Sequence, residues 1–137
     1  MADIKVPPHS DDAEASVLGA ILIDKDSIVE VAGFLRPEHF YSNVNAEIYE
    51  AILSLYEKRT PIDLVTLSDA LKKKKALSQI GGMEYLTGLT DNVPTSANIE
   101  HYGKIVKNHF TKRKLINTAS KISQDSFDEA IDVKDLL

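Results

Sequence analysis

A helical period that runs from Ser96 to about Ser123 constrains the fold of this chain more than any other feature. The stretch contains no proline and only one glycine, Gly103. At roughly seven turns it is about twice as long as a typical globular helix. Its apolar residues wrap around the helix more widely than the stripe of about 100° that covers one core. One apolar face is therefore left over, and the helix must project beyond a domain of 137 residues.

The leftover face predicts self-association of the long helix. The residues expected to contribute most are Phe110, Leu115, Ile116, Ala119 and Ile122. A polar break follows at residues 125–129, and apolar residues start again at Ile131. This pattern is typical of a helical hairpin that contacts a partner, and we expect the second arm to be truncated in this sequence.

The remaining apolar segments also repeat at helical period, and the strand signal is poor. We therefore predict an all-α fold in a single domain. Residues 11–92 are expected to form a small globular helical bundle, and residues 93–137 the long helix and the start of the hairpin. Residues 1–10 are expected to be a flexible leader, in which Pro7 and Pro8 favour an extended backbone.

Polar residues indicate where the helices begin. The first helix is expected to start at Ser10 or Asp11. Asp11 and Glu14 have the spacing of a capping box, and we expect their carboxylates to stabilise the N-terminus of this helix. Gly19 lies inside that helix, where a glycine costs about 1 kcal/mol relative to alanine, so we expect it to permit close helix packing. Three later helices are expected to have caps at Asn43, Asp63 and Ser96.

Composition is typical of a soluble globular protein, with 43% hydrophobic and 27% charged residues. The absence of cysteine excludes a disulfide framework, a thiolate zinc site and a cysteine nucleophile. No apolar run reaches the length of about 18 residues that marks a membrane span, and the start of the chain lacks the layout of a signal peptide. We therefore expect a cytoplasmic protein without a membrane partner.

Charge is unevenly distributed along the chain. Residues 1–70 hold 5 basic and 13 acidic side chains, whereas residues 71–122 hold 10 basic and 3 acidic ones. Lys104, Lys107 and Lys114 fall near one line of the long helix and could contact phosphate groups. A solvated helix face accounts for the same pattern, so both interpretations stay open.

No set of residues indicates catalysis. The chain has no phosphate-binding GxxxxGK[ST] motif, so we predict no nucleotide or other cofactor site and no enzymatic activity. The four histidines are too scattered for paired metal ligands, and we predict no metal site.

Six strings in order resemble the N-terminal domain of the bacterial replicative DNA helicase, the DnaB family, over essentially the whole chain from Pro7. They start with EASVLGA at residues 14–20 and FY at 40–41, continue with PIDLVTL at 61–67 and IGG with YL at 80–86, and end with VPTSANI at 93–99 and RKLI at 113–116. The resemblance implies a small helical bundle with a protruding hairpin. In that family the hairpin pairs domains into dimers, and three dimers form a collar on a hexameric ring.

The resemblance also implies that the motor is absent from this sequence. A linker and a RecA-like ATPase domain would follow, with the ATP and Mg²⁺ site and most DNA contacts, so the parent is expected to be an ATP-dependent DNA helicase. In the family the collar docks primase, and a helicase loader is a possible further partner. The residues of this sequence that match the primase-docking positions are Tyr85, Ile116 and Ile122.

Two other functions fit parts of the sequence. A free-standing basic helical module would bind nucleic acid through the lysines of the long helix, and its binding would weaken steeply with salt. The helicase-binding domain of primase is a further alternative, against which the VPTSAN and PIDLVTL strings favour the helicase.

Overall fold

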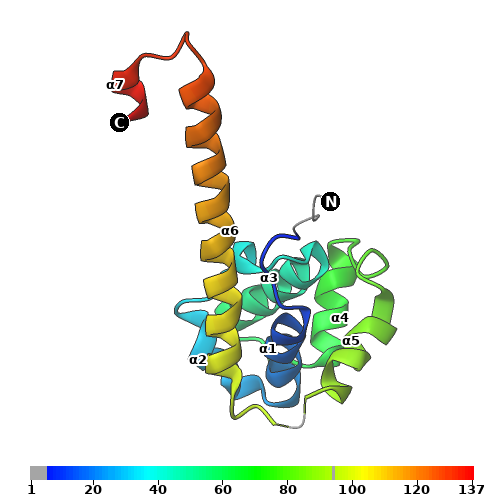
Figure 1. Ribbon diagram of the computed structural model, residues 1–137. Helices are drawn as coiled ribbons and strands as arrows, with labels where there is room; N and C mark the ends of the chain where they lie inside the picture. The colour runs from blue at the N-terminus through cyan, green and yellow to red at the C-terminus, as the bar shows by residue number, and fades with distance from the viewer. Residues whose placement is uncertain (1–5, 94) are drawn as a thin grey trace.

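Helices provide all the regular secondary structure of residues 6–93 and 95–137, the part of the chain that the computed structural model describes (Figure 1). The α-helices are α1 (Asp11–Ile23), α2 (Val29–Ala32), α3 (Asn43–Glu57), α4 (Leu64–Lys73), α5 (Gly82–Asp91), α6 (Ile99–Phe127) and α7 (Val133–Leu136). A 3₁₀ turn, Lys25–Ile28, lies between α1 and α2, and a second one, Pro37–His39, lies between α2 and α3. The prediction of an all-α fold is confirmed.

The bundle is built around α1, which packs against α3, α5 and α6. Val17, Leu18 and Ile21 of α1 are completely buried. A Cβ atom added at Gly19 would lie 2.2 Å from the carbonyl oxygen of Leu89 in α5. The glycine therefore allows α5 to approach the backbone of α1, as its position inside the first helix predicted.

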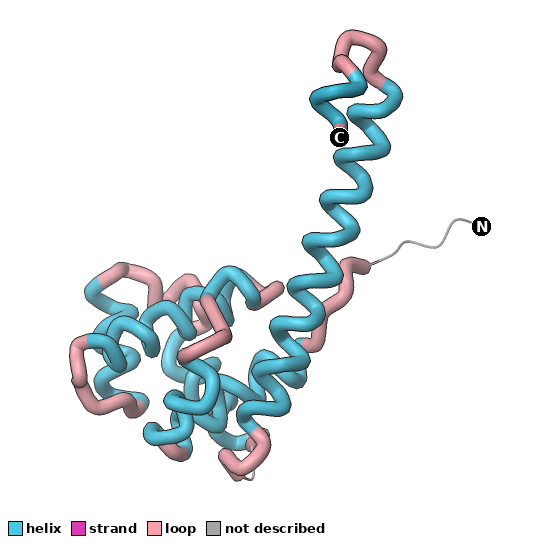
Figure 2. Tube along the Cα trace, turned by 90° about the vertical axis from the view of Figure 1, so that its left-hand side faces the viewer, coloured by secondary structure: helices cyan, strands magenta, loops and turns pink. Residues whose placement is uncertain are grey.

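Helix α6 has two halves with different environments. In its first half Ile99, Gly103 and Val106 are buried, and the space at Gly103 is filled by side chains that include Val31 of α2. Its second half leaves the bundle and projects into solvent, and α7 turns back beside its far end (Figures 1 and 2). The protruding arm and the start of a hairpin are therefore confirmed. None of the described helices is both long and apolar enough to span a membrane.

The helix starts agree with the sequence in part. Asp63 caps α4, since its carboxylate accepts the Thr66 N–H at 2.8 Å. The cap of α3 is Ser42 rather than Asn43, which is the first helical residue. The long helix begins at Ile99 rather than at Ser96, because Ser96 belongs to the preceding turn and its hydroxyl donates to the Asp24 carboxylate at 3.1 Å.

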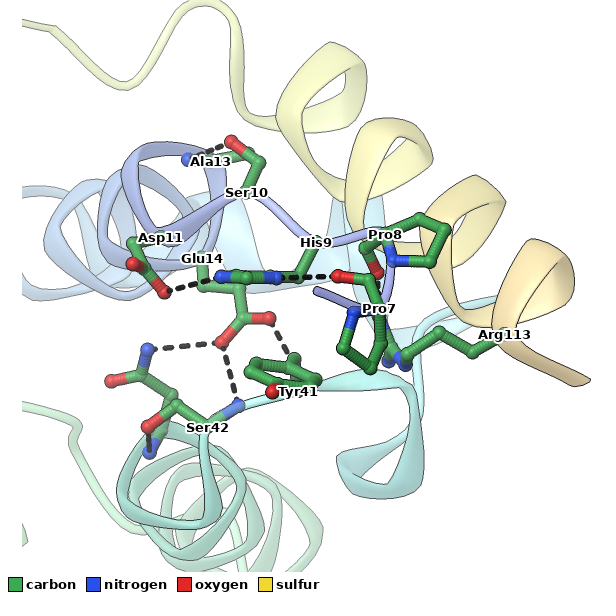
Figure 3. Close-up of polar contacts among 11 residues, drawn as sticks. Pro7, Pro8, His9, Ser10, Asp11, Ala13, Glu14, Tyr41, Ser42 and Arg113 are labelled. Carbon is green, nitrogen blue, oxygen red and sulfur yellow. Dashed lines mark hydrogen bonds and ion pairs between the residues drawn. The ribbon is translucent and has the colours of Figure 1, made fainter. Parts of the chain in front are cut away.

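Glu14 differs most from its expected role. Ser10 caps α1 by accepting the Ala13 N–H at 3.1 Å, so the capping box expected from Asp11 and Glu14 is wrong. The Glu14 side chain is 1% exposed, and it turns inward to accept the backbone N–H groups that precede α3 (Figure 3). Sequence spacing could not reveal this role, because the partners lie 27 and 28 residues away.

Candidate partner-binding surface on the long helix

The projecting half of α6 carries several exposed apolar side chains. Leu115, Ile116 and Ile122 are 64%, 54% and 53% exposed, and Ala119 is exposed as well. By helical spacing these four side chains span about 120° of the arm. We call them the arm face. Exposed apolar residues that gather on a projecting element are typical of an interface.

Phe110, the fifth residue predicted for self-association, has a different position. Its ring is only partly exposed and lies 4.7 Å from the ring of His39, between centroids. Phe110 therefore contributes to the contact between α6 and the bundle. The structure places it at the base of the arm, and the arm face begins beyond it.

Arg113 fixes the point at which α6 leaves the bundle. Its Nη1 donates to the carbonyl oxygen of Pro8 at 2.7 Å (Figure 3). Its Nη2 donates to the carbonyl oxygen of His39 at 2.9 Å. The guanidinium carbon also lies 5.3 Å from the ring centroid of Tyr41 and 5.8 Å from that of Phe110. Arginine suits this position because its planar group can donate in two directions and stack on aromatic rings. Sequence reasoning assigned no role to Arg113.

The stretch of leader next to Arg113 lies against the bundle. The His9 ring stacks on the Tyr41 ring with centroids 4.1 Å apart, and its Nδ1 lies 2.7 Å from the carbonyl oxygen of Pro7. Residues 1–5 of the predicted leader lie outside the described residues. The described part of the leader is therefore held at the base of the arm by contacts with α6 and with the segment before α3.

An open groove of about 1150 Å³ lies between the leader, residues 38–41 and α6. Ile116 lines this groove together with Phe40 and Phe110. The basic side chains that line it are those of Arg113, Lys114 and Lys121. Ile122 does not line it. The groove and the arm face therefore overlap at Ile116.

His39 supports the base of the arm as a neutral group. Its Nδ1 accepts the backbone N–H of Arg36 at 2.9 Å, which requires an unprotonated nitrogen. Burial lowers the pKa of His39; Glu38 opposes this shift, and nearby Lys107 adds to it. Among the residues that the structure describes, no group of three or more His, Asp or Glu side chains could hold a metal ion.

Tyr85, the third residue predicted for primase docking, lies apart from the other two. It belongs to α5 and packs partly buried against the core, whereas the arm extends away from the bundle in both views (Figures 1 and 2). Its hydroxyl donates to Oδ1 of Asn45 at 2.5 Å. The structure therefore brings Ile116 and Ile122 together on the arm but does not bring Tyr85 to them within one chain.

The three lysines proposed for phosphate contact have different neighbours. Lys104 forms an ion pair with Glu100 at 3.1 Å. The ammonium of Lys107 lies 5.9 Å from the Phe34 ring centroid, and Lys114 lines the groove. This arrangement divides the positive charge among three different environments.

Comparison with known proteins decides the family. The model of the N-terminal domain of DnaB-like helicases matches residues 6–108. The chain belongs to this family. The resemblance carried by the six sequence strings is thus confirmed.

Relatives of this family match most of the chain. The replicative DNA helicase DnaB of Geobacillus stearothermophilus is 40% identical over 131 residues, which are 94% of this chain and 29% of that protein. The chain therefore spans less than a third of the length of this relative.

Solved structures agree in fold. The N-terminal domain of the DnaB helicase from Mycobacterium tuberculosis superimposes with a TM-score of 0.90 at 38% identity, covering 96% of this chain and 92% of that one. The corresponding domain from Helicobacter pylori, which interacts with primase, gives a TM-score of 0.74 at 31% identity, covering 85% of this chain and 91% of that one.

Proposed function

We propose that this chain is the non-catalytic N-terminal domain of a replicative DNA helicase and that it serves assembly and primase docking in DNA replication. The observation that carries this proposal is the arm face: a DnaB-family domain presents Leu115, Ile116, Ala119 and Ile122 to solvent on an arm that Arg113 holds at a fixed exit point. Docking to primase is proposed because the Helicobacter pylori relative interacts with primase.

The activity of the parent protein is part of the same proposal. We place ATP hydrolysis, Mg²⁺ binding and most DNA contacts in a motor domain beyond this chain, because the chain has no phosphate-binding motif. Dimers formed through the arms, and three dimers joined into a collar, would put this domain on one face of the motor ring. A helicase loader is a further possible partner of the same assembly.

Ile116→Asp is expected to shift self-association toward the monomer. Burying an isoleucine side chain is worth roughly 1.5–3 kcal/mol, so an aspartate in its place should weaken a dimer by tenfold or more. Sedimentation of the variant beside the unaltered chain measures the shift. Val65→Asp is a suitable control because Val65 is 75% exposed on α4, away from the arm. Equal dimer fractions for the Ile116 variant and the parent would remove Ile116 from the contact.

Tyr85→Ala and Ile122→Ala are expected to weaken primase binding more than Lys107→Ala. Apolar and aromatic anchors at interfaces commonly cost about 2 kcal/mol or more when truncated, whereas an exposed charge usually costs less than about 1 kcal/mol. Binding to the cognate primase is to be measured at low and at physiological salt. We expect little dependence on salt, because the docking is mainly apolar.

Binding of each variant to single-stranded DNA is the control for this comparison. The nucleic-acid alternative predicts that Lys107→Ala is the most damaging change and that DNA affinity falls steeply as salt rises. That result would replace the assembly and docking function with the basic-module function.

A further inference from the structure

The hydroxyl of Tyr85 is already used inside the bundle. It donates to Oδ1 of Asn45 at 2.5 Å, and Asn45 is 3% exposed. The tyrosine ring itself is only partly buried. A partner that docks here therefore meets the ring and not a free hydroxyl group.

The orientation of the Asn45 amide is fixed from its other side. Its Nδ2 donates to Oε1 of Glu14 at 3.1 Å. The same carboxylate accepts the backbone N–H groups of Tyr41 at 2.8 Å and Ser42 at 3.3 Å. Because this carboxylate faces only N–H donors, the amide nitrogen must point toward it, and the amide oxygen must point toward the tyrosine.

These contacts form a relay from α1 through α3 to α5. The relay consists of Glu14 in α1, Asn45 in α3 and Tyr85 in α5. Both of its hydrogen bonds join residues that lie at least 31 positions apart in the sequence. Burial raises the pKa of the Tyr85 hydroxyl, and the nearby carboxylates of Glu14 and Asp11 raise it further, while the hydrogen bond with Asn45 opposes the shift without cancelling it. The hydroxyl thus keeps the proton that it donates to Asn45.

We infer that Asn45, held by Glu14, is a positioning residue for partner docking, because it fixes the Tyr85 ring in the orientation that the partner binds. This inference rests on the proposed primase docking at Tyr85. A ring held in place before binding loses less side-chain freedom in the complex, which favours affinity. The partner surface opposite Tyr85 then needs no hydrogen-bond acceptor for the hydroxyl.

A double-mutant cycle on primase binding tests the relay. Asn45→Ala, Tyr85→Ala and the double variant are to be compared with the parent in the full-length protein. We expect Tyr85→Ala to weaken binding about thirtyfold, in the range of an interface anchor. Asn45→Ala should weaken it about tenfold in the parent and less than twofold in the Tyr85→Ala variant. Tyr85→Phe, which removes the same hydrogen bond but keeps the ring, should resemble Asn45→Ala.

Ser27→Ala is the control that distinguishes positioning of the Tyr85 ring from a general loss of stability of the bundle. Ser27 is 6% exposed, and its hydroxyl donates to the Asp24 carbonyl at 2.7 Å without contacting the relay. We expect unchanged primase binding for this variant, with every variant shown to be folded by circular dichroism. Equal weakening by Asn45→Ala with and without Tyr85 would overturn the inference, since the effect would not pass through the tyrosine.

The same measurements distinguish failure of the inference from failure of the proposed function. If Tyr85→Ala has no effect while Ile122→Ala weakens binding, docking on the arm stands and the relay is wrong. If neither change affects primase binding, the proposed docking surface is wrong together with the relay. Ile122→Ala is the reference in both cases because Ile122 is exposed on the arm, away from the relay.

Discussion

Gly19→Ala is expected to lower the free energy of unfolding by about 1–2 kcal/mol. The added Cβ would lie 2.2 Å from the Leu89 carbonyl oxygen and 2.6 Å from Cγ2 of Val93. The first of these atoms belongs to the backbone, so α1 and α5 must separate to relieve the overlap. Overpacking of this kind costs about 1–3 kcal/mol and occasionally more, and it outweighs the gain in helix propensity of about 1 kcal/mol. Urea unfolding of both proteins measures the difference.

Gly88→Ala is the matched control for this prediction. Gly88 also lies inside a helix, α5, but apart from its chain neighbours and the backbone of its own helix no described atom lies within 4 Å of an added Cβ. Only the propensity term remains, so this variant is expected to be more stable than the parent by about 0.5–1 kcal/mol. If both alanine variants shift the urea midpoint in the same direction, the close approach of α5 to Gly19 is not what stabilises the bundle.

The sequence predicted those features that depend on local periodicity. The unbroken apolar period of α6, with more apolar surface than the bundle can cover, indicated both the projecting arm and the exposure of Ile116 and Ile122. Ser10 and Asp63 lie where helices begin because short polar side chains satisfy free N–H groups locally. Such signals need only neighbours within one or two turns.

Contacts between distant segments could not be predicted in the same way. Arg113 sits in a basic stretch that looks solvated, yet its guanidinium donates to carbonyl groups 105 and 74 residues away. Glu14 follows the serine cap at a spacing that also suits a helix N-terminus, and only the fold shows it facing α3. Both side chains bind backbone groups, which leave no residue pattern in the sequence.

The separation of Tyr85 from the arm has a consequence for the docking surface. Motif matching assigned Tyr85, Ile116 and Ile122 to one partner, but the bundle carries the first and the arm carries the other two. A primase that docks on all three residues, as proposed above, must therefore contact both the bundle and the arm. Primase binding is to be measured for Tyr85→Ala, for Ile122→Ala and for the variant that carries both changes. Additive losses of binding free energy would indicate two independent surfaces, and non-additive losses one joint surface.

Glu14→Ala is expected to destabilise the bundle by about 3–4 kcal/mol. The carboxylate is 1% exposed and accepts N–H groups from Tyr41, Ser42 and Asn45. Its removal leaves one buried and two partly buried donors without their partner. Each unsatisfied buried donor costs about 1–3 kcal/mol before water or local relaxation compensates. Denaturant unfolding followed by circular dichroism measures the loss.

Glu14→Gln should cost less, about 2 kcal/mol, since an amide keeps the size of the side chain but turns one acceptor atom into a donor facing N–H groups. Glu47→Ala on the exposed face of α3 is the control, and a surface change of this kind is expected to stay within about 0.5 kcal/mol. The unfolding free energies of the proteins with alanine, glutamine and glutamate at position 14 therefore measure how much the buried carboxylate between α1 and α3 contributes to the stability of the bundle. A Glu14→Ala variant as stable as Glu47→Ala would mean that the three N–H groups find other acceptors. The hydrogen bonds of Glu14 would then contribute nothing to the stability of the bundle.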